Sequence, residues 1–135
     1  MVEYVSGNGK FASFGAYSPL ARISAPQELV AVAGQLGADS GGGLTGAGDM
    51  AAQVRQVFQN VGTALEEAGL SFGDILKFTT YVVGRDNIPD FMSTRTEVFA
   101  EIYPDGKYPP NTLLIVPGLV EERFVVEVEA LAARV

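Results

Sequence analysis

The chain of 135 residues contains no cysteine, no histidine and no tryptophan. Without cysteine it can form neither a disulfide framework nor a thiolate nucleophile. Without histidine it lacks the commonest metal ligand of proteins and the commonest general base near neutral pH. These absences exclude a Cys/His zinc site and a Ser-His-Asp triad. No dense run of acidic residues resembles a calcium-binding loop, so we expect no bound metal.

Clusters of basic residues and long apolar runs are also missing. The net charge is −7, and neutralisation of phosphates supplies most of the affinity of proteins for nucleic acids, so we expect no nucleic-acid partner. No apolar run approaches the roughly 20 residues needed to span a bilayer. The first eleven residues lack the basic and apolar regions of a secretory signal. We therefore expect a cytoplasmic protein that does not enter membranes.

The residues that are present suit a globular domain. Hydrophobic residues make up 47% of the chain, and 135 residues are enough for one domain with a real core. We therefore predict a single domain over residues 1–135.

Two segments have the periodicity of amphipathic helices. Apolar residues recur at helical spacing from 50 to 68. Asp49 is suited to cap that helix, and Gly69 is suited to end it in the left-handed conformation. A second helix is predicted over residues 87–102, with Pro89 in its first turn, where a missing amide costs little.

β-Branched and aromatic residues between turn signals predict short strands early in the chain and one long strand after the first helix. The predicted strands before the last quarter of the chain are 2–5, 11–14, 19–24, 28–33 and 74–83. The turn residues 6–10 would join the first two, and Ala25-Pro26-Gln27 would join the next two as a hairpin. The glycine-rich segment 38–48 has neither a phosphate-loop ending nor dinucleotide-binding spacing, so we interpret it as a surface loop.

The last quarter of the chain holds two more strands and a pair of glutamates. Along Phe124–Leu131 the residues alternate, so that Glu127 and Glu129 lie on one face about 7 Å apart. Either this face is wet or paired across an interface, or one carboxylate lines a ligand pocket. The order of elements predicts an α+β domain with two helices on one face of a mixed sheet. The other face, half polar and half apolar, favours self-association.

One arginine lies on the apolar stripe of the second predicted helix. Arg95 follows Phe91 by four residues and precedes Val98 by three, which places all three on one side of the helix. An arginine there usually extends its charged end to the edge of the core. It could also reach a carboxylate across an interface.

At this point the chain resembles the Rid (YjgF/YER057c/UK114) family, from about Tyr17 to Ala132. The order and spacing of several short pieces carry the resemblance. These pieces are Tyr17-Ser18, Ala33-Gly34-Gln35, the helix with Gln53 and Arg55 that ends in Glu66-Glu67-Ala68-Gly69, Asp74–Thr80, Phe99-Ala100-Glu101, Pro109-Pro110 and the final VEVEALA.

The resemblance implies a chorismate-mutase-like α+β subunit in a homotrimer, with small ligands bound in clefts between subunits. It also implies hydrolysis of imines or enamines, which yields a 2-keto acid and ammonia without a metal or cofactor. By the same resemblance, Glu127 falls on the glutamate that positions the attacking water, and Tyr17 on an aromatic residue that lines the pocket. The backbone amide of Gly34 falls on a group that holds the substrate carboxylate.

The chain also departs from the pattern of the deaminating members. Thr112 stands where their carboxylate-binding arginine is found. Ala33 replaces a frequent serine, and Thr96 a frequent asparagine. Loss of a bidentate arginine contact costs about 2–5 kcal/mol at a buried site.

Three functions therefore remain open from the sequence. The first is a homotrimer that binds a small metabolite with Tyr17, Ala33, Gly34, Thr112 and Arg95. It either binds this metabolite without turnover or hydrolyses, with Glu127, an imine or enamine other than a simple 2-imino acid. The second is a genuine 2-imino or enamino acid deaminase, with Arg95 or Arg123 substituting for the missing arginine. The third is a non-catalytic regulatory or structural trimer.

Overall fold

A four-stranded sheet with the strand order β3-β6-β4-β5 forms the centre of the protein. The computed structural model describes residues 1–45 and 49–135. The β3/β6 and β6/β4 pairs are antiparallel and the β4/β5 pair is parallel, so the sheet is mixed. The strands are β3 (Glu28–Leu36), β4 (Ile75–Val83), β5 (Asn111–Val116) and β6 (Val126–Arg134).

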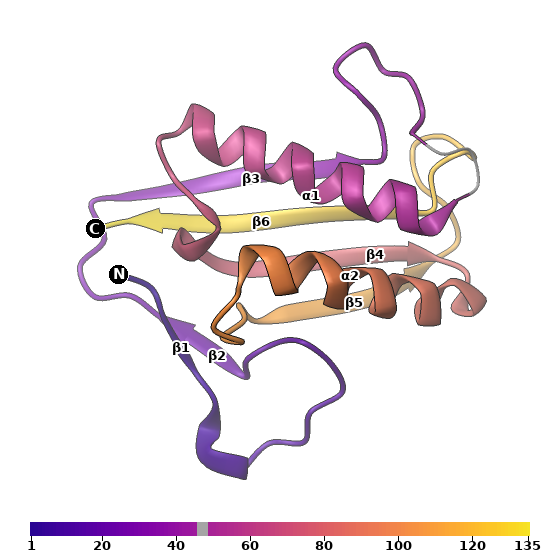
Figure 1. Ribbon diagram of the computed structural model, residues 1–135. Helices are drawn as coiled ribbons and strands as arrows, with labels where there is room; N and C mark the ends of the chain where they lie inside the picture. The colour runs from indigo at the N-terminus through magenta and orange to yellow at the C-terminus, as the bar shows by residue number, and fades with distance from the viewer. Residues whose placement is uncertain (46–48) are drawn as a thin grey trace.

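Two helices, α1 (Met50–Glu67) and α2 (Ile88–Ile102), cover one face of this sheet (Figure 1). Asp49 caps α1, because its carboxylate accepts hydrogen bonds from the amides of Ala51 and Ala52. Gly69 follows the end of α1 with a φ of 70°, the conformation predicted for it. The predicted α+β architecture is therefore confirmed.

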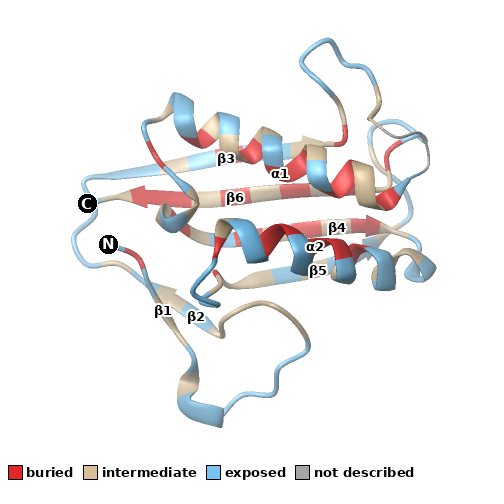
Figure 2. Ribbon diagram, viewed as in Figure 1, coloured by how far each residue is buried: buried red, intermediate tan, exposed pale blue. Residues whose placement is uncertain are grey.

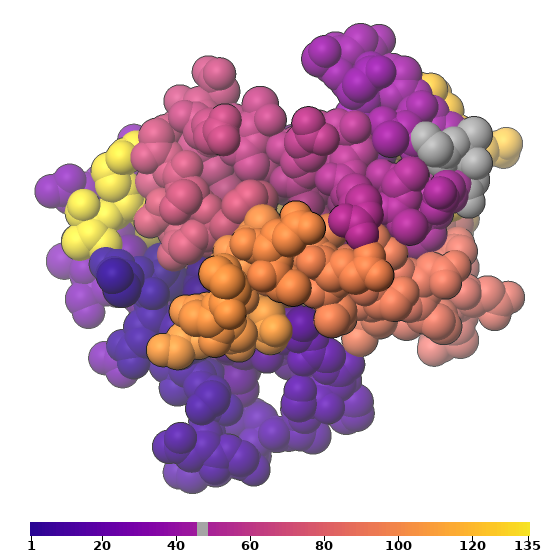
Figure 3. All heavy atoms as spheres, viewed as in Figure 1, coloured from indigo at the N-terminus to yellow at the C-terminus, as the bar shows by residue number. Residues whose placement is uncertain are grey.

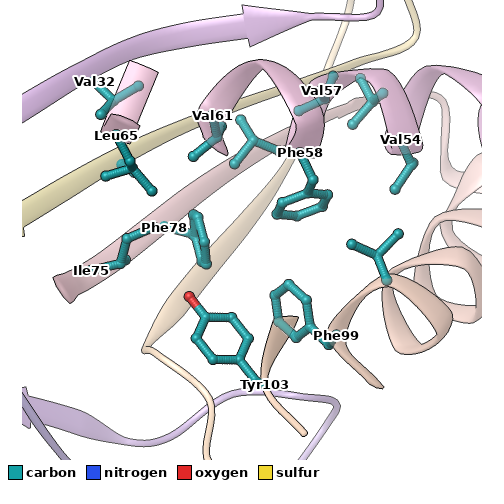
Figure 4. Close-up of a cluster of buried hydrophobic side chains, with 14 of the residues drawn as sticks. Val32, Val54, Val57, Phe58, Val61, Leu65, Ile75, Phe78, Phe99 and Tyr103 are labelled. Atoms are coloured by element: carbon teal, nitrogen blue, oxygen red, sulfur yellow. The ribbon is translucent and has the colours of Figure 1, made fainter. Parts of the chain in front are cut away.

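The core fills the space between the helices and the sheet. Buried residues follow the inward sides of α1 and α2 and continue along β4 and β6 (Figure 2). Phe58 meets Phe78 and Phe99 edge-on, with ring centroids 5.6 and 5.4 Å apart. These rings lie among Val54, Val57, Val61 and Leu65 from α1 (Figure 4). In the space-filling view, α1 and α2 form one continuous layer in front of the strands (Figure 3).

The opposite face of the sheet has no helix over it among the described residues. Val126, Val128 and Ala130 point into the core, so Glu127 and Glu129 point to the uncovered face. The predicted alternation along β6 is therefore confirmed. Large apolar side chains remain accessible on the outer strands of this sheet: Leu29 of β3 is 60% exposed and Leu114 of β5 is 43% exposed.

The N-terminal segment forms a separate two-stranded sheet from β1 (Glu3–Val5) and β2 (Leu20–Arg22). The prediction of a returning strand at Phe11–Phe14 is wrong, because β2 makes that pairing instead. Phe11 and Phe14 are exposed, so no sheet or core selects an extended conformation for them. The described residues also include three short 3₁₀ segments, which are Gly7–Gly9, Phe72–Asp74 and Arg85–Asn87.

The predicted hairpin around Ala25-Pro26-Gln27 is also wrong. Ala25 has a φ of 48°, and the turn carries the chain from the small sheet into the main sheet. There β3 pairs with β6, from Glu28 opposite Arg134 to Leu36 opposite Glu127. Strand partners are decided by packing between distant segments, which local turn residues do not report.

The glycine-rich segment lies at the surface where it is described. The carboxylate of Asp39 accepts hydrogen bonds from the amides of Gly41 and Gly43, and these residues are exposed. Residues 46–48 of the predicted loop lie outside the described residues. Among the helices that are described, none combines the length and the apolar character needed to cross a bilayer.

Candidate functional site

Glu127 lies on the uncovered sheet face against the backbone of β3. A Cβ atom on Gly34 would lie only 2.7 Å from Oε1 of Glu127, so glycine leaves the space that the carboxylate occupies. Burial raises the pKa of Glu127 above its ordinary value, and the nearby charge of Glu129 raises it further. A partly buried carboxylate with a raised pKa is suited to exchange protons with a ligand or a water molecule.

Glu129 has a different environment on the same face. It accepts a hydrogen bond from the hydroxyl group of Tyr81, which lies across the β4/β6 pair. This hydrogen bond is the main reason why the pKa of Tyr81 is raised. The two glutamates therefore differ, because Glu129 has a side-chain donor and no such donor to Glu127 is found among the described residues.

A second group of predicted residues lies around a pocket of about 400 Å³ between α2 and the start of β5. Tyr17, Arg95 and Thr112 all line this pocket. The loop that carries Tyr17 is held beside β5, because the amide of Ser18 donates a hydrogen bond to the carbonyl oxygen of Pro109 at 3.4 Å. The remaining lining residues are Phe14, Ile88, Met92, Asn111 and Leu113.

Among the described residues that line this pocket, Arg95 is the only one with a charged side chain, and it is only 3% exposed. Its Cζ atom lies 5.1 Å from the ring centroid of Phe91 and 5.7 Å from that of Phe99, within range for cation–π attraction. Its Nη2 atom lies 3.3 Å from the sulfur of Met92. Its buried Nε atom has no hydrogen-bond partner among the described residues. Burial lowers the pKa of Arg95 to about 10, which leaves it charged at neutral pH.

This environment corrects the expectation that Arg95 extends its charged end to the edge of the core, because the whole side chain is buried. The N-terminal loop closes over the side chain: a Cβ atom on Gly15 would lie 2.8 Å from Nη2 of Arg95. Because that loop packs there through distant contacts, the periodicity of the helix could not reveal the burial. Arg123, the other candidate arginine, forms an ion pair with Glu121 and donates a hydrogen bond to the carbonyl oxygen of Gly42. Its guanidinium group is therefore already engaged.

Within one chain the predicted site residues form two groups. Gly34 and Glu127 are together, with Ala33 exposed beside them on β3. Tyr17, Arg95 and Thr112 form the other group. Because β4 separates β6 from β5, the backbones of these two strands are about 10 Å apart.

Five further residues that line the pocket were not predicted to be functional, namely Phe14, Ile88, Met92, Asn111 and Leu113. Asn111 accepts a hydrogen bond from Thr80 at 2.8 Å, which fixes it at the pocket, and its position next to Thr112 could have indicated it. Phe14 and Met92 carried no functional signal in the sequence. Thr96 is exposed, and its hydroxyl group donates to the carbonyl oxygen of Met92, so it does not line the pocket. Across the described residues no three acidic side chains converge as a metal site requires.

The protein is thus an α+β subunit with one uncovered sheet face and a small pocket at the edge of that sheet. Comparison with known proteins shows which family it belongs to. The family model described as Endoribonuclease L-PSP matches residues 8–134. A RutC family protein of Pyrococcus horikoshii is 33% identical over 101 residues, which cover 75% of each chain. A 2-iminobutanoate/2-iminopropanoate deaminase of Salmonella typhimurium is 32% identical over 106 residues, which cover 78% of this chain and 80% of the relative.

Solved structures agree with this assignment. The YjgF gene product of Escherichia coli superposes with a TM-score of 0.71 at 26% identity, covering 98% of this chain and 99% of the other. A Rid-family protein of unknown function, YyfB from Yersinia pestis, superposes with a TM-score of 0.84 at 24% identity and covers 98% of both chains, a likeness of fold. The chain belongs to the Rid family, as the resemblance of its motifs predicted.

Proposed function

We propose that this protein hydrolyses an imine or enamine in a cleft between the subunits of a homotrimer, with Glu127 as the group that activates water. The observation that carries the proposal is the state of Glu127: it is partly buried on the uncovered sheet face, against Gly34, and burial raises its pKa. The deaminase relatives support the reaction class.

In the proposed reaction the carboxylate of Glu127 accepts a proton from a water molecule as the oxygen attacks the carbon of the C=N bond. Glu127 then returns this proton to the nitrogen of the tetrahedral intermediate. The hydroxyl proton of that intermediate then passes through Glu127 to the nitrogen as the C–N bond breaks, which releases ammonia and a carbonyl product. The step needs no oxidant or reductant, because one imine and one water give one carbonyl compound and one ammonia.

Homotrimer formation is part of the proposal for two reasons. Leu29 and Leu114 expose apolar surface on the sheet that has no helix over one face, and packing of subunits through that sheet would bury such surface. Glu127 and the Arg95 pocket lie on different strands of one chain, so a neighbouring subunit can bring one group to the other. Light scattering at micromolar concentration should give three times the 14.2 kDa mass of one chain, and a monomeric mass would refute this part.

The test of the reaction uses imines generated in place from amino acids by an amino-acid oxidase. We expect the parent protein to speed the release of 2-keto acid and ammonia above the spontaneous rate. Glu127→Gln should lose about 100-fold or more of that acceleration, the usual contribution of a general base. Glu67→Gln, an exposed carboxylate of α1, is the matched control and should keep it. Full activity of Glu127→Gln would exclude Glu127 as the base.

Binding without turnover is the second candidate, and Thr112 is the observation that favours it. A threonine offers one hydroxyl group and no charge where the deaminating members are expected to hold the substrate with arginine. If the parent is inactive towards 2-iminopropanoate and Thr112→Arg is active, the rest of the site is competent and the natural protein is a binder or acts on another compound. If the parent is active, this second candidate fails.

A further inference from the structure

The most unusual group in the molecule is a buried cation without a counter-ion. Arg95 is 3% exposed, none of the four ion pairs found among the described residues includes it, and its Nε atom has no hydrogen-bond partner there. An unpaired buried charge is strongly unfavourable, because the protein interior does not replace the water that solvated it. The aromatic rings of Phe91 and Phe99 compensate only part of this, since cation–π attraction is weaker than pairing with an anion.

The position of the Arg95 guanidinium group indicates which kind of molecule could supply its missing counter-ion. It borders the pocket of about 400 Å³, whose other polar lining groups, Tyr17, Asn111 and Thr112, are uncharged. A guanidinium group offers five donors in a planar fork that matches a carboxylate. An anion that enters this pocket would therefore meet one fixed charge and several neutral hydrogen-bonding groups. None of the described residues that line the pocket carries a negative charge that would repel it.

The other residues that line the pocket indicate the chemical character of the part of the ligand beyond its carboxylate. Phe14, Ile88, Met92 and Leu113 present apolar surface. At about 30 Å³ per water molecule, 400 Å³ equals the volume of about 13 waters. A three-carbon imino acid has only six heavy atoms, so it would leave much of this apolar surface uncovered.

We infer that Arg95 holds the carboxylate of the ligand from helix α2, and that this ligand carries an apolar body of aryl or branched-alkyl size beside its carboxylate. The inference deepens the proposed function and rests on it in one respect, namely that this pocket is part of the cleft in which the imine reacts. In this arrangement the positive charge that binds the carboxylate comes from Arg95 on helix α2. Position 112 on strand β5, where the deaminating members are expected to carry an arginine, is an uncharged threonine.

Calorimetric binding tests the inference without any need for turnover. The probes are phenylpyruvate, its methyl ester and pyruvate, all added to the intact protein. We expect phenylpyruvate to bind at least tenfold more tightly than the ester, which has the same body without the charge. We also expect it to bind at least tenfold more tightly than pyruvate, which has the charge without the body. Equal affinity for the acid and the ester would overturn the role of the charge. Equal affinity for phenylpyruvate and pyruvate would overturn the apolar body.

Variants of Arg95 test whether its positive charge is the one that binds the carboxylate. Arg95→Met keeps a long apolar stem and should remove the difference between acid and ester, whereas Arg95→Lys should retain part of it. Arg123→Met is the matched control, because that arginine is paired with Glu121 outside the pocket, and it should bind like the parent. Parental acid binding by folded Arg95→Met would overturn the inference. If Arg95→Met fails to fold, Arg95→Lys and the acid–ester comparison in the parent decide the question.

Two further outcomes separate this inference from the proposed function. Binding that depends on Arg95, in a protein without turnover on any imine, supports the inference and refutes the proposed hydrolysis. Turnover that depends on Glu127 but is unaffected by Arg95→Met refutes the inference and leaves the hydrolysis in place. A crystal structure in which Arg95 pairs with a carboxylate of a neighbouring subunit would also overturn the inference, because the charge would then be structural.

Discussion

The side chain of Gln53 should hold the start of β6 in place. Gln53 is fully buried on α1, where its Nε2 donates to the carbonyl oxygen of Arg123 at 3.0 Å and its Oε1 accepts from the amide of Val125 at 3.0 Å. These two bonds fix the backbone directly before Val126, and Glu127 follows. The perturbation that tests this role is Gln53→Leu, which keeps the approximate size of the side chain and removes both bonds.

The magnitude follows from the two groups that lose a partner. The partly buried amide of Val125 should cost about 1–3 kcal/mol when left unsatisfied. Arg123 is an exposed residue, so water can replace Gln53 at its carbonyl oxygen, and that loss should be at the low end, about 0.5 kcal/mol. The extra apolar surface of leucine returns about 1 kcal/mol. The net expectation is a destabilisation of about 0.5–2.5 kcal/mol.

Urea unfolding at fixed protein concentration measures this change. With a denaturant dependence of about 2 kcal/mol per molar, the midpoint should fall by about 0.3–1.3 M. Gln59→Leu, an exposed glutamine on the same helix, is the control and should shift stability by less than about 0.5 kcal/mol. If the two variants unfold at the same urea concentration, the hydrogen bonds of Gln53 do not stabilise the start of β6.

Two further predictions concern the carboxylate on β6. Because the pKa of Glu127 is raised on folding, the stability linked to its protonation is fully present below the unfolded value of about 4.3 and is lost as pH rises through the raised value. Glu127→Gln should therefore unfold at higher urea than the parent at pH 8 and at the same urea at pH 4, and an equal difference at both pH values would contradict this reasoning. Gly34→Ala should displace the Glu127 carboxylate by roughly 1 Å and lower imine hydrolysis by about 100-fold. Gly73→Ala, whose Cβ would lie 3.9 Å from Oγ of Ser71, should keep the parental rate, and equal rates for both variants would remove the reason for glycine at position 34.

The sequence predicted the parts of the fold that local patterns encode. The helices from Met50 and Ile88 were predicted from apolar periodicity, and the inward and outward faces of β6 from strict alternation. Strand partners were not predicted, because β3 pairs with β6 across about a hundred residues. The local turn at Ala25 suggested a nearer partner, and packing in the main sheet outweighed it.

The resemblance to the family named candidate site residues, but it did not predict the environment of each one. The proximity of Gly34 to Glu127, and that of Tyr17 to Thr112, follow the resemblance to the family. The burial of Arg95 could not follow from it, because the loop that covers this side chain has no regular structure to read from the sequence. A glycine at position 15 is the one local sign of that close approach, and glycine has many other uses.

The position of β6 in the sheet has a consequence for how the protein is made. This strand is the last element along the chain, yet it lies between β3 and β4 and pairs with both. On the ribosome, β3 and β4 are therefore synthesised long before the strand that joins them, and both carry unpaired backbone groups until Arg134 has emerged from the exit tunnel. The main sheet should consequently be completed only after β6 has emerged from the exit tunnel, and the nascent chain should be a candidate for chaperones that protect open strand edges.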